Sequence, residues 1–134
     1  MIVRSIAIPI VVAVGVLSVL PAEDDTGTQG KTVVVKMVDK SATEFSFEPA
    51  DVTVRRGDVI RFVQTSTTPH NVEFKDGPEG TEFNGDRVGP YLLTPDETYE
   101  ISIDNRFATG VHKYVCTPHA FMGMVGTITV EAGR

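Results

Sequence analysis

The sequence predicts an all-β fold, a sandwich or barrel of roughly eight short antiparallel strands. Segments in which apolar and polar residues alternate follow one another along the chain, and turn-forming residues separate them. No segment after the first 31 residues repeats its apolar residues with the period of a helix. The length of 134 residues fits one domain.

The first half of the chain supplies four of the expected strands. Residues 31–38 form a valine-rich run, and residues 44–47 alternate before a proline ends the pattern. Residues 52–54 and 59–63 alternate again, and the sequence Arg-Arg-Gly-Asp at 55–58 forms the turn between them.

The second half supplies the other four strands, at 70–74, 98–103, 111–116 and 125–130. The long connection between the first two of these is rich in Gly, Pro and acidic residues. It is therefore expected to be a loop, with one helical turn near 79–83.

The N-terminal segment has the layout of a secretory signal peptide, with a short basic start, an apolar run and a small residue before an acidic stretch. We expect residues 1–22 to be this signal and the protein to be exported, into the periplasm or another extracytoplasmic space. The alternative is an uncleaved membrane anchor formed by residues 5–20, since that run is almost long enough to span a bilayer. Residues 23–31 are predicted to be a flexible lead-in and residues 32–134 the folded domain.

Composition and charge exclude several classes of function. A hydrophobic fraction of 41% and a charged fraction of 22% argue against general disorder. The net charge of −6 argues against nucleic-acid binding. Cys116 is the single cysteine, which excludes an intramolecular disulfide and every metal site that needs two thiolates. A single thiol in an oxidising compartment is open to oxidation, and a bound metal would protect it.

One connection near the C-terminus holds three potential metal ligands. Cys116, His119 and Met124 lie between the last two predicted strands, and thiolate, imidazole and thioether together favour copper. His70, which starts an earlier strand, is the candidate for a fourth ligand at the same end of the fold. Two histidines, one cysteine and one weak methionine are the ligands of blue-copper electron-transfer sites.

These residues resemble those of the small type 1 blue copper proteins, the cupredoxins, and most closely plastocyanin, pseudoazurin, amicyanin and halocyanin. The resemblance rests on His70-Asn71, on Cys116-x2-His119-x4-Met124 and on the strand patterns around them, and it covers about residues 44–130. It implies a Greek-key β-sandwich of seven to eight strands. It also implies one copper ion that cycles between Cu(I) and Cu(II).

The resemblance assigns roles to individual residues. Cys116, His70 and His119 would bind copper in one plane, and Met124 would be the long axial ligand, with Met122 as the rival. Around these ligands, Asn71 would link the His70 loop to Thr117, while Pro118 has no N–H to offer the cysteine sulfur.

The same resemblance implies transient docking of larger redox proteins, such as a cytochrome, a copper enzyme or a membrane redox complex. The exposed edge of His119 would be the contact, and its apolar rim would be Pro118, Ala120, Phe121 and Met122. We expect the protein to be a monomer.

His112 alternates with Tyr114 and Cys116 and is predicted to be a core residue.

Two other functions compete with electron transfer. An enzyme with a second copper site would need further histidines, and only His112 is left over, so we expect no enzymatic activity. A periplasmic copper carrier or storage protein is the remaining alternative. Such a protein releases its copper, whereas an electron shuttle keeps it in both oxidation states.

Overall fold

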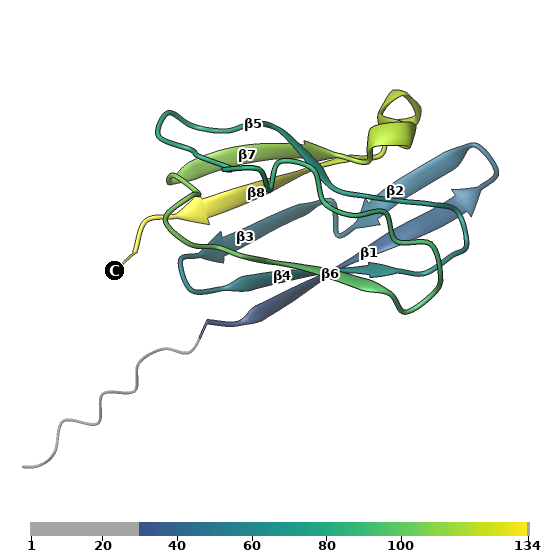
Figure 1. Cartoon of the computed structure of the whole chain (residues 1–134), viewed down its shortest axis with the longest axis horizontal. Helices are drawn as coiled ribbons and strands as arrows, with labels where there is room; N and C mark the ends of the chain where they lie inside the picture. Colours follow the sequence, from purple (N-terminus) through teal and green to yellow (C-terminus); the bar gives the residue numbers. More distant parts are fainter. Residues whose placement is uncertain (1–29, 134) are drawn as a thin grey trace, which may run out of the picture.

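The computed structural model describes residues 30–133, which form eight strands and one short 3₁₀ helix (Figure 1). The strands are β1 (Thr32–Ser41), β2 (Glu44–Glu48), β3 (Asp51–Arg55), β4 (Val59–Gln64), β5 (Glu73–Asp76), β6 (Thr98–Ser102), β7 (Gly110–Val115) and β8 (Val125–Glu131). The 3₁₀ helix, η1 (Thr117–Met122), lies between the last two strands. The expected signal peptide or anchor lies outside the described residues.

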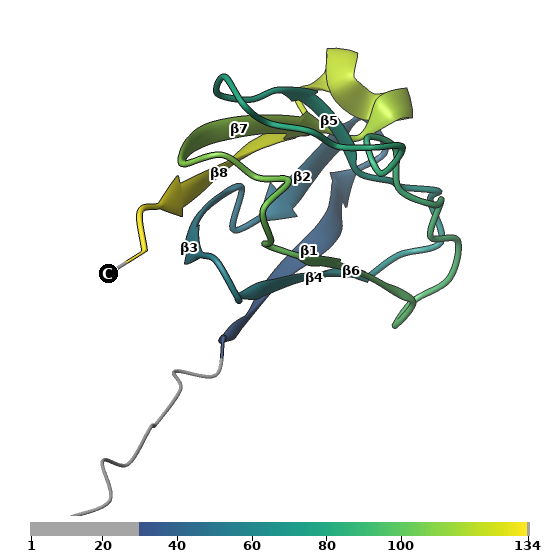
Figure 2. The same ribbon diagram turned by 60° about the vertical axis from the view of Figure 1, so that its left-hand side comes forward.

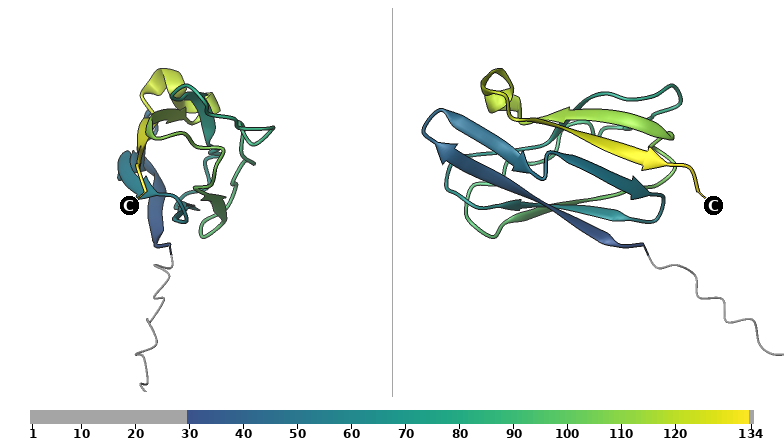
Figure 3. Two further views of the ribbon diagram at one scale, coloured as in Figure 1. Left: turned by 90° about the vertical axis from the view of Figure 1, so that its left-hand side faces the viewer. Right: turned by 180° about the vertical axis from the view of Figure 1, so that it is seen from behind.

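The strands form two four-stranded sheets that pack face to face (Figure 3). One sheet has the order β2-β1-β4-β6 and the other the order β3-β8-β7-β5. The all-β sandwich predicted from the sequence is therefore confirmed. Two neighbouring pairs, β1–β4 and β3–β8, are parallel rather than antiparallel. The chain crosses between the sheets before it returns to these neighbours, so two strands can run in the same direction.

The core fills the space between the sheets with the inward-facing residue of each alternating pair. In β4, for example, Ile60, Phe62 and Gln64 are buried, while Arg61 points outward. Aromatic rings dominate the centre, where Tyr114 packs edge-on against Phe62. The alternation that predicted the strands is therefore also what builds the core.

Three local features differ from the sequence-based expectations. The strand expected from His70 begins only at Glu73, because the main chain of His70 pairs with Leu92 instead of with β7. Residues 79–80 form a turn, residues 81–83 are irregular, and no helical turn is present in this segment. The connection from residue 117 to residue 122, expected to be a loop, is η1.

None of the helices among residues 30–133 is long and apolar enough to cross a membrane. The expected membrane anchor is not part of this region.

Candidate metal centre

The candidate ligands gather at one end of the sandwich, where η1 is seen in Figures 1 and 2. Cys116 follows β7, His119 lies within η1, and Met124 precedes β8. His70 reaches the same end from the connection between β4 and β5. The fold therefore brings His70 to Cys116, His119 and Met124, as the sequence predicted.

Three donor atoms converge at this end. The Nδ1 atoms of His70 and His119 are 3.0 Å apart. The Cys116 sulfur lies 3.6 Å from Nδ1 of His70 and 3.5 Å from Nδ1 of His119. Both imidazoles thus direct the same ring nitrogen toward the sulfur, which is the arrangement that a metal bound to all three needs.

The two methionines of this segment lie in different environments. Met124 is completely buried, and its main chain is hydrogen-bonded to both neighbouring ligand residues: its carbonyl accepts the N–H of Cys116 at 3.0 Å, and its N–H donates to His119 at 3.2 Å. Met122 is 50% exposed. Met124 therefore belongs to the buried side of the cluster, while Met122 belongs to the surface.

Local chain chemistry explains why a 3₁₀ turn forms here. Pro118 stands in the first turn of η1, where its fixed φ suits a helix and its missing N–H costs nothing. Gly123 ends the turn in the left-handed conformation at φ 85°, which glycine adopts without a steric penalty. The N–H of Gly123 donates to the carbonyl of Ala120. This turn holds His119 between Cys116 and Met124.

Asn71 and Thr117 join the two ligand-bearing loops. The Asn71 side chain accepts the Thr117 main-chain N–H at 2.8 Å and donates to the Thr117 hydroxyl at 2.9 Å. That hydroxyl in turn donates to Glu73. The structure thus places Asn71 and Thr117 as expected, and it adds Glu73 to the link.

A second set of bonds fixes the loop that precedes His70. The buried side chain of Gln64 donates to the carbonyls of Thr68 and Leu92, at 2.8 and 2.9 Å. Its oxygen accepts the N–H groups of Thr65 and Ser66. A buried amide that satisfies both ends of a loop holds that loop in one conformation.

Two residues beside the histidines were not singled out from the sequence. Asp39 of β1 contacts Nε2 of His70 at 2.7 Å. Phe45 of β2 stacks on the His119 ring, with centroids 4.0 Å apart and planes at 25°. A signal existed, since Asp39 continues the inward-facing series of Val35 and Met37, where a charged side chain is unusual.

Burial and hydrogen bonding shift the ionisation of these groups. Burial raises the pKa of the Cys116 thiol, although main-chain N–H groups of Asn71 and His119 offset part of the effect. Burial lowers the pKa of His119, and the charge of His70 lowers it further, against the opposing charge of Asp39. For Asp39, burial would raise the pKa, but hydrogen bonds from Thr68, His70 and Ser66 outweigh burial and lower it. In the metal-free protein the thiol is therefore protonated at neutral pH, and a metal ion must displace its proton.

The predicted docking residues lie on the outside of this end. Phe121 is fully exposed, Pro118 and Met122 are exposed, and Ala120 is half-buried. His119 is also half-buried, whereas His70 has no exposed surface. Of the two histidines, His119 is thus the one that reaches the surface, within an apolar surround.

His112 lies away from the cluster and is part of the core, as predicted. It is completely buried, packs against the ring of Phe107, and contacts the Ala108 carbonyl through Nε2 at 2.8 Å. Its Nδ1 atom has no partner among the described residues. Burial lowers the pKa of His112, with the bond to Ala108 acting in the opposite direction.

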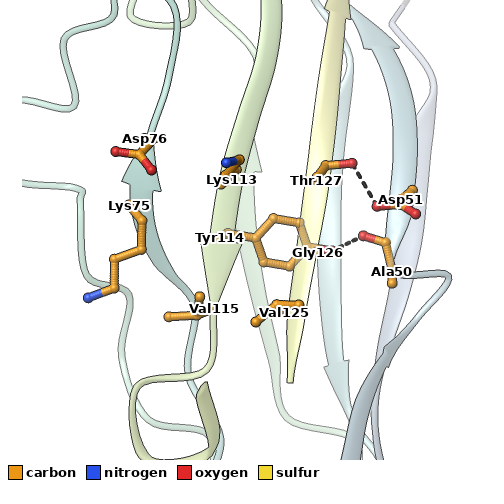
Figure 4. A pocket seen from close by; sticks show the side chains of 10 residues that line it. All are labelled: Ala50, Asp51, Lys75, Asp76, Lys113, Tyr114, Val115, Val125, Gly126 and Thr127. Atoms are coloured by element: carbon orange, nitrogen blue, oxygen red, sulfur yellow. Dashed lines mark hydrogen bonds between the residues drawn. The ribbon is translucent and has the colours of Figure 1, made fainter. Parts of the chain in front are cut away.

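A separate groove of about 560 Å³ lies on the β3-β8-β7-β5 sheet (Figure 4). Val115 and Val125 line it together with Lys75 and Lys113, and Asp51 and Asp76 stand at its sides. None of the four candidate ligands lines this groove. This groove is therefore separate from the cluster of candidate ligands.

The donor set fits copper. The Cys116 sulfur and two imidazole nitrogens lie within 4.8 Å of one another, and Met124 adds a buried thioether. Zinc sites in proteins seldom use thioether, whereas this combination of soft and intermediate ligands suits copper in both of its oxidation states. His70, Cys116, His119 and Met124 are arranged as a copper site.

Comparisons with known proteins agree with this geometry. The profile of the copper-binding plastocyanin/azurin family matches residues 33–131. The chain is 37% identical to chloroplastic plastocyanin of Oryza sativa subsp. indica over 63% of this chain, and the match spans 54%, about half, of that relative. It is 36% identical to plastocyanin of Scenedesmus fuscus, over 63% of this chain and 86% of that relative.

The fold comparison gives the same result. The crystal structure of amicyanin from Paracoccus versutus superposes with a TM-score of 0.55 at 26% sequence identity. The superposition covers 84% of this chain and 85% of amicyanin. The cluster, the fold and the sequence match therefore lead to one conclusion: the chain belongs to the plastocyanin/azurin family of copper-binding proteins.

Proposed function

We propose that this blue copper electron-transfer protein shuttles single electrons between larger redox proteins outside the cytoplasm. The observation that carries the proposal is the convergence of Cys116, His70 and His119, with Met124 buried beside them. When bound, copper would supply one-electron chemistry by cycling between Cu(I) and Cu(II). Export is supported by the apolar segment near the N-terminus of the sequence.

The rigidity of the site supports a shuttle over a copper carrier or storage protein. His70 is buried, hydrogen-bonded at its outer nitrogen and linked through the next residue to the Cys116 loop. A site held in one geometry reduces the rearrangement that accompanies a change of oxidation state, and it hinders release of the ion. A carrier would instead need a site that opens.

The proposed exit for the electron is the edge of His119. This ring is the histidine that reaches the surface, and Pro118, Ala120, Phe121 and Met122 surround it with apolar area. A small apolar patch suits weak, short-lived docking of a redox partner. The partner would be a cytochrome, a copper enzyme or a membrane redox complex, and the protein would act as a monomer.

The first test is the visible spectrum after Cu(II) is added to the purified metal-free protein. An intense blue colour is expected, from charge transfer between the Cys116 thiolate and Cu(II). Cys116→Ser should lose the colour, because a hydroxyl is a harder and less covalent donor. A wild-type protein that binds copper and stays colourless would refute the proposal, and rapid transfer of copper to a chelator in either oxidation state would favour the carrier.

The second test concerns the docking surface. Ala120→Lys adds a charge beside His119 without removing a ligand, and should slow electron transfer to a cytochrome while leaving the colour unchanged. Val111→Lys is the matched control, because Val111 is exposed near the other end of β7. Transfer is measured by stopped flow at two ionic strengths. Equal rates for both variants would mean that the electron leaves elsewhere.

A further inference from the structure

We propose that Asp39 is a positioning residue of the copper centre. Its carboxylate would hold the proton of His70 on Nε2, keep Nδ1 free for the metal, and favour Cu(II) through its negative charge. This inference rests on the proposed copper function and adds a residue that no ligand motif contains.

The two nitrogens of His70 have different partners. Nδ1 faces the sulfur of Cys116 and Nδ1 of His119, while Nε2 lies 2.7 Å from Oδ1 of Asp39. A carboxylate can only accept a hydrogen bond, so Nε2 must be the donor. The proton then sits on Nε2, and Nδ1 keeps the lone pair that a metal needs.

In the wild type, solvent does not reach the ring nitrogen of His70 that faces Asp39. The His70 side chain has no exposed surface, and Nε2 contacts only Asp39 among the described residues. Without the carboxylate, a buried N–H would be left without an acceptor, at a cost comparable to a lost hydrogen bond. Moving the proton to Nδ1 would relieve that cost, but it would block the metal-binding nitrogen.

Asp39 is itself fixed in place. Its second oxygen accepts the hydroxyl of Thr68, which belongs to the loop that carries His70. That loop is tied to β1 again where the hydroxyl of Thr65 donates to the carbonyl of Met37. The carboxylate is therefore held by the strand on one side and by the His70 loop on the other, and this orients the imidazole rather than following it.

The charge of Asp39 is not cancelled by a neighbouring cation. Within residues 30–133, no lysine or arginine forms an ion pair with Asp39, and nearby Lys40 pairs with Glu48 instead. The Asp39 side chain is only 24% exposed, so solvent screens it less than an ordinary surface charge. An anion behind one ligand stabilises the more positive metal ion, so Asp39 should lower the reduction potential.

The first measurement uses the metal-free protein and needs no copper. ¹⁵N NMR at pH 8 reports which ring nitrogen of each histidine is protonated. His70 should carry its proton on Nε2 in the wild type and lose that preference in Asp39→Ala. The same tautomer in both proteins would overturn the positioning role.

The second measurement compares reduction potentials of the copper-loaded proteins. Asp39→Asn keeps the size and the acceptor oxygen but removes the charge. It should shift the redox equilibrium of the bound copper toward Cu(I) about tenfold. This is the lower end of the roughly 10–100-fold loss of metal affinity or activity that follows when a ligating histidine loses its hydrogen-bond partner. Tenfold corresponds to about 59 mV for one electron.

Glu44→Gln is the matched control. Glu44 lies on β2, across the hairpin from Ser41, and it is exposed and has no contact with His70. Glu44→Gln removes the same charge from the same hairpin, and the reduction potential of this variant should stay close to that of the wild type. Equal shifts for Asp39→Asn and Glu44→Gln, or a lower potential for Asp39→Asn, would overturn the charge effect.

These outcomes separate the two proposals. If the wild type forms the blue centre and Asp39→Asn has the same potential as the wild type, the charge effect of Asp39 is contradicted. The proposed electron-transfer function is not affected by that result. A wild type without the blue centre contradicts the proposed function, and the tautomer of His70 still decides the positioning role. Circular dichroism of both Asp39 variants verifies that each is folded.

Discussion

Replacing Gln64 with leucine should lower the free energy of unfolding substantially, because the Gln64 amide makes several hydrogen bonds. Leucine has a similar size but neither donor nor acceptor, so all bonds of the amide to the loop before His70 are lost. Two main-chain groups keep other partners: Leu92 O still accepts from His70 N, and Thr65 N still donates to Met37 O. The carbonyl of Thr68 and the N–H of Ser66 lose the bond that the amide supplied.

The magnitude follows from these two groups. A buried polar group without a partner costs about 1–3 kcal/mol, and partial access of water to both Ser66 and Thr68 keeps each share below the upper end of that range. The expected loss in the free energy of unfolding of the metal-free protein is therefore about 3 kcal/mol. With a urea m-value of about 1.5 kcal/mol/M, the midpoint of unfolding falls by about 2 M.

Urea unfolding followed by circular dichroism measures this loss. Thr67→Ala is the control, since Thr67 is exposed in the same loop and should change stability by no more than about 0.5 kcal/mol. A loss below about 1 kcal/mol for Gln64→Leu would refute the reasoning, because the loop would then be held by something other than the amide.

Three further predictions concern Met124, His112 and Gly126. Met124→Gln should keep copper and lower its potential, because an amide oxygen favours Cu(II), whereas Met122→Gln should change the potential little; voltammetry compares them. Burial lowers the pKa of His112 in the folded state, so the unfolded chain binds more protons. The free energy of unfolding should therefore fall as the pH drops below about 6.5, by about 1.4 kcal/mol for each unit by which folding lowers the pKa. His112→Phe should remove this part of the pH dependence, which urea titrations at pH 7.5 and 5.5 detect as a smaller difference. Gly126→Ala should unfold or severely destabilise the protein in a thermal melt, since an added Cβ would lie 2.3 Å from the carbonyl oxygen of Ala50.

Much of the fold could be predicted because buried and exposed residues alternate along its strands. Each strand buries alternate residues, as in Val52 and Val54 of β3, and this pattern is visible without any structure. Pairing across the sandwich could not be predicted in this way. His70 alternates as a strand residue would, yet its main chain bonds to Leu92, a partner 22 residues away in a segment with no periodic pattern.

The ligands could be predicted for a different reason. Cys116, His119 and Met124 lie within nine residues, so their spacing alone brings them together, and one further histidine completes the set. The groups around the ligands could not be found by spacing. Asp39 and Phe45 lie far from the ligand motif in the sequence, and only the packing of β1 and β2 against the end of the sandwich brings them to the histidines.

The β1–β2 hairpin contains no ligand, yet it contacts both histidines. Asp39 and Phe45 are direct partners across this hairpin: Asp39 lies behind the buried His70, and Phe45 lies against the half-buried His119. A charge favours the oxidised metal, and an apolar ring that excludes water favours the less charged reduced one. Replacing these two positions would therefore change the reduction potential of a bound copper ion while the metal-binding loop stays unaltered.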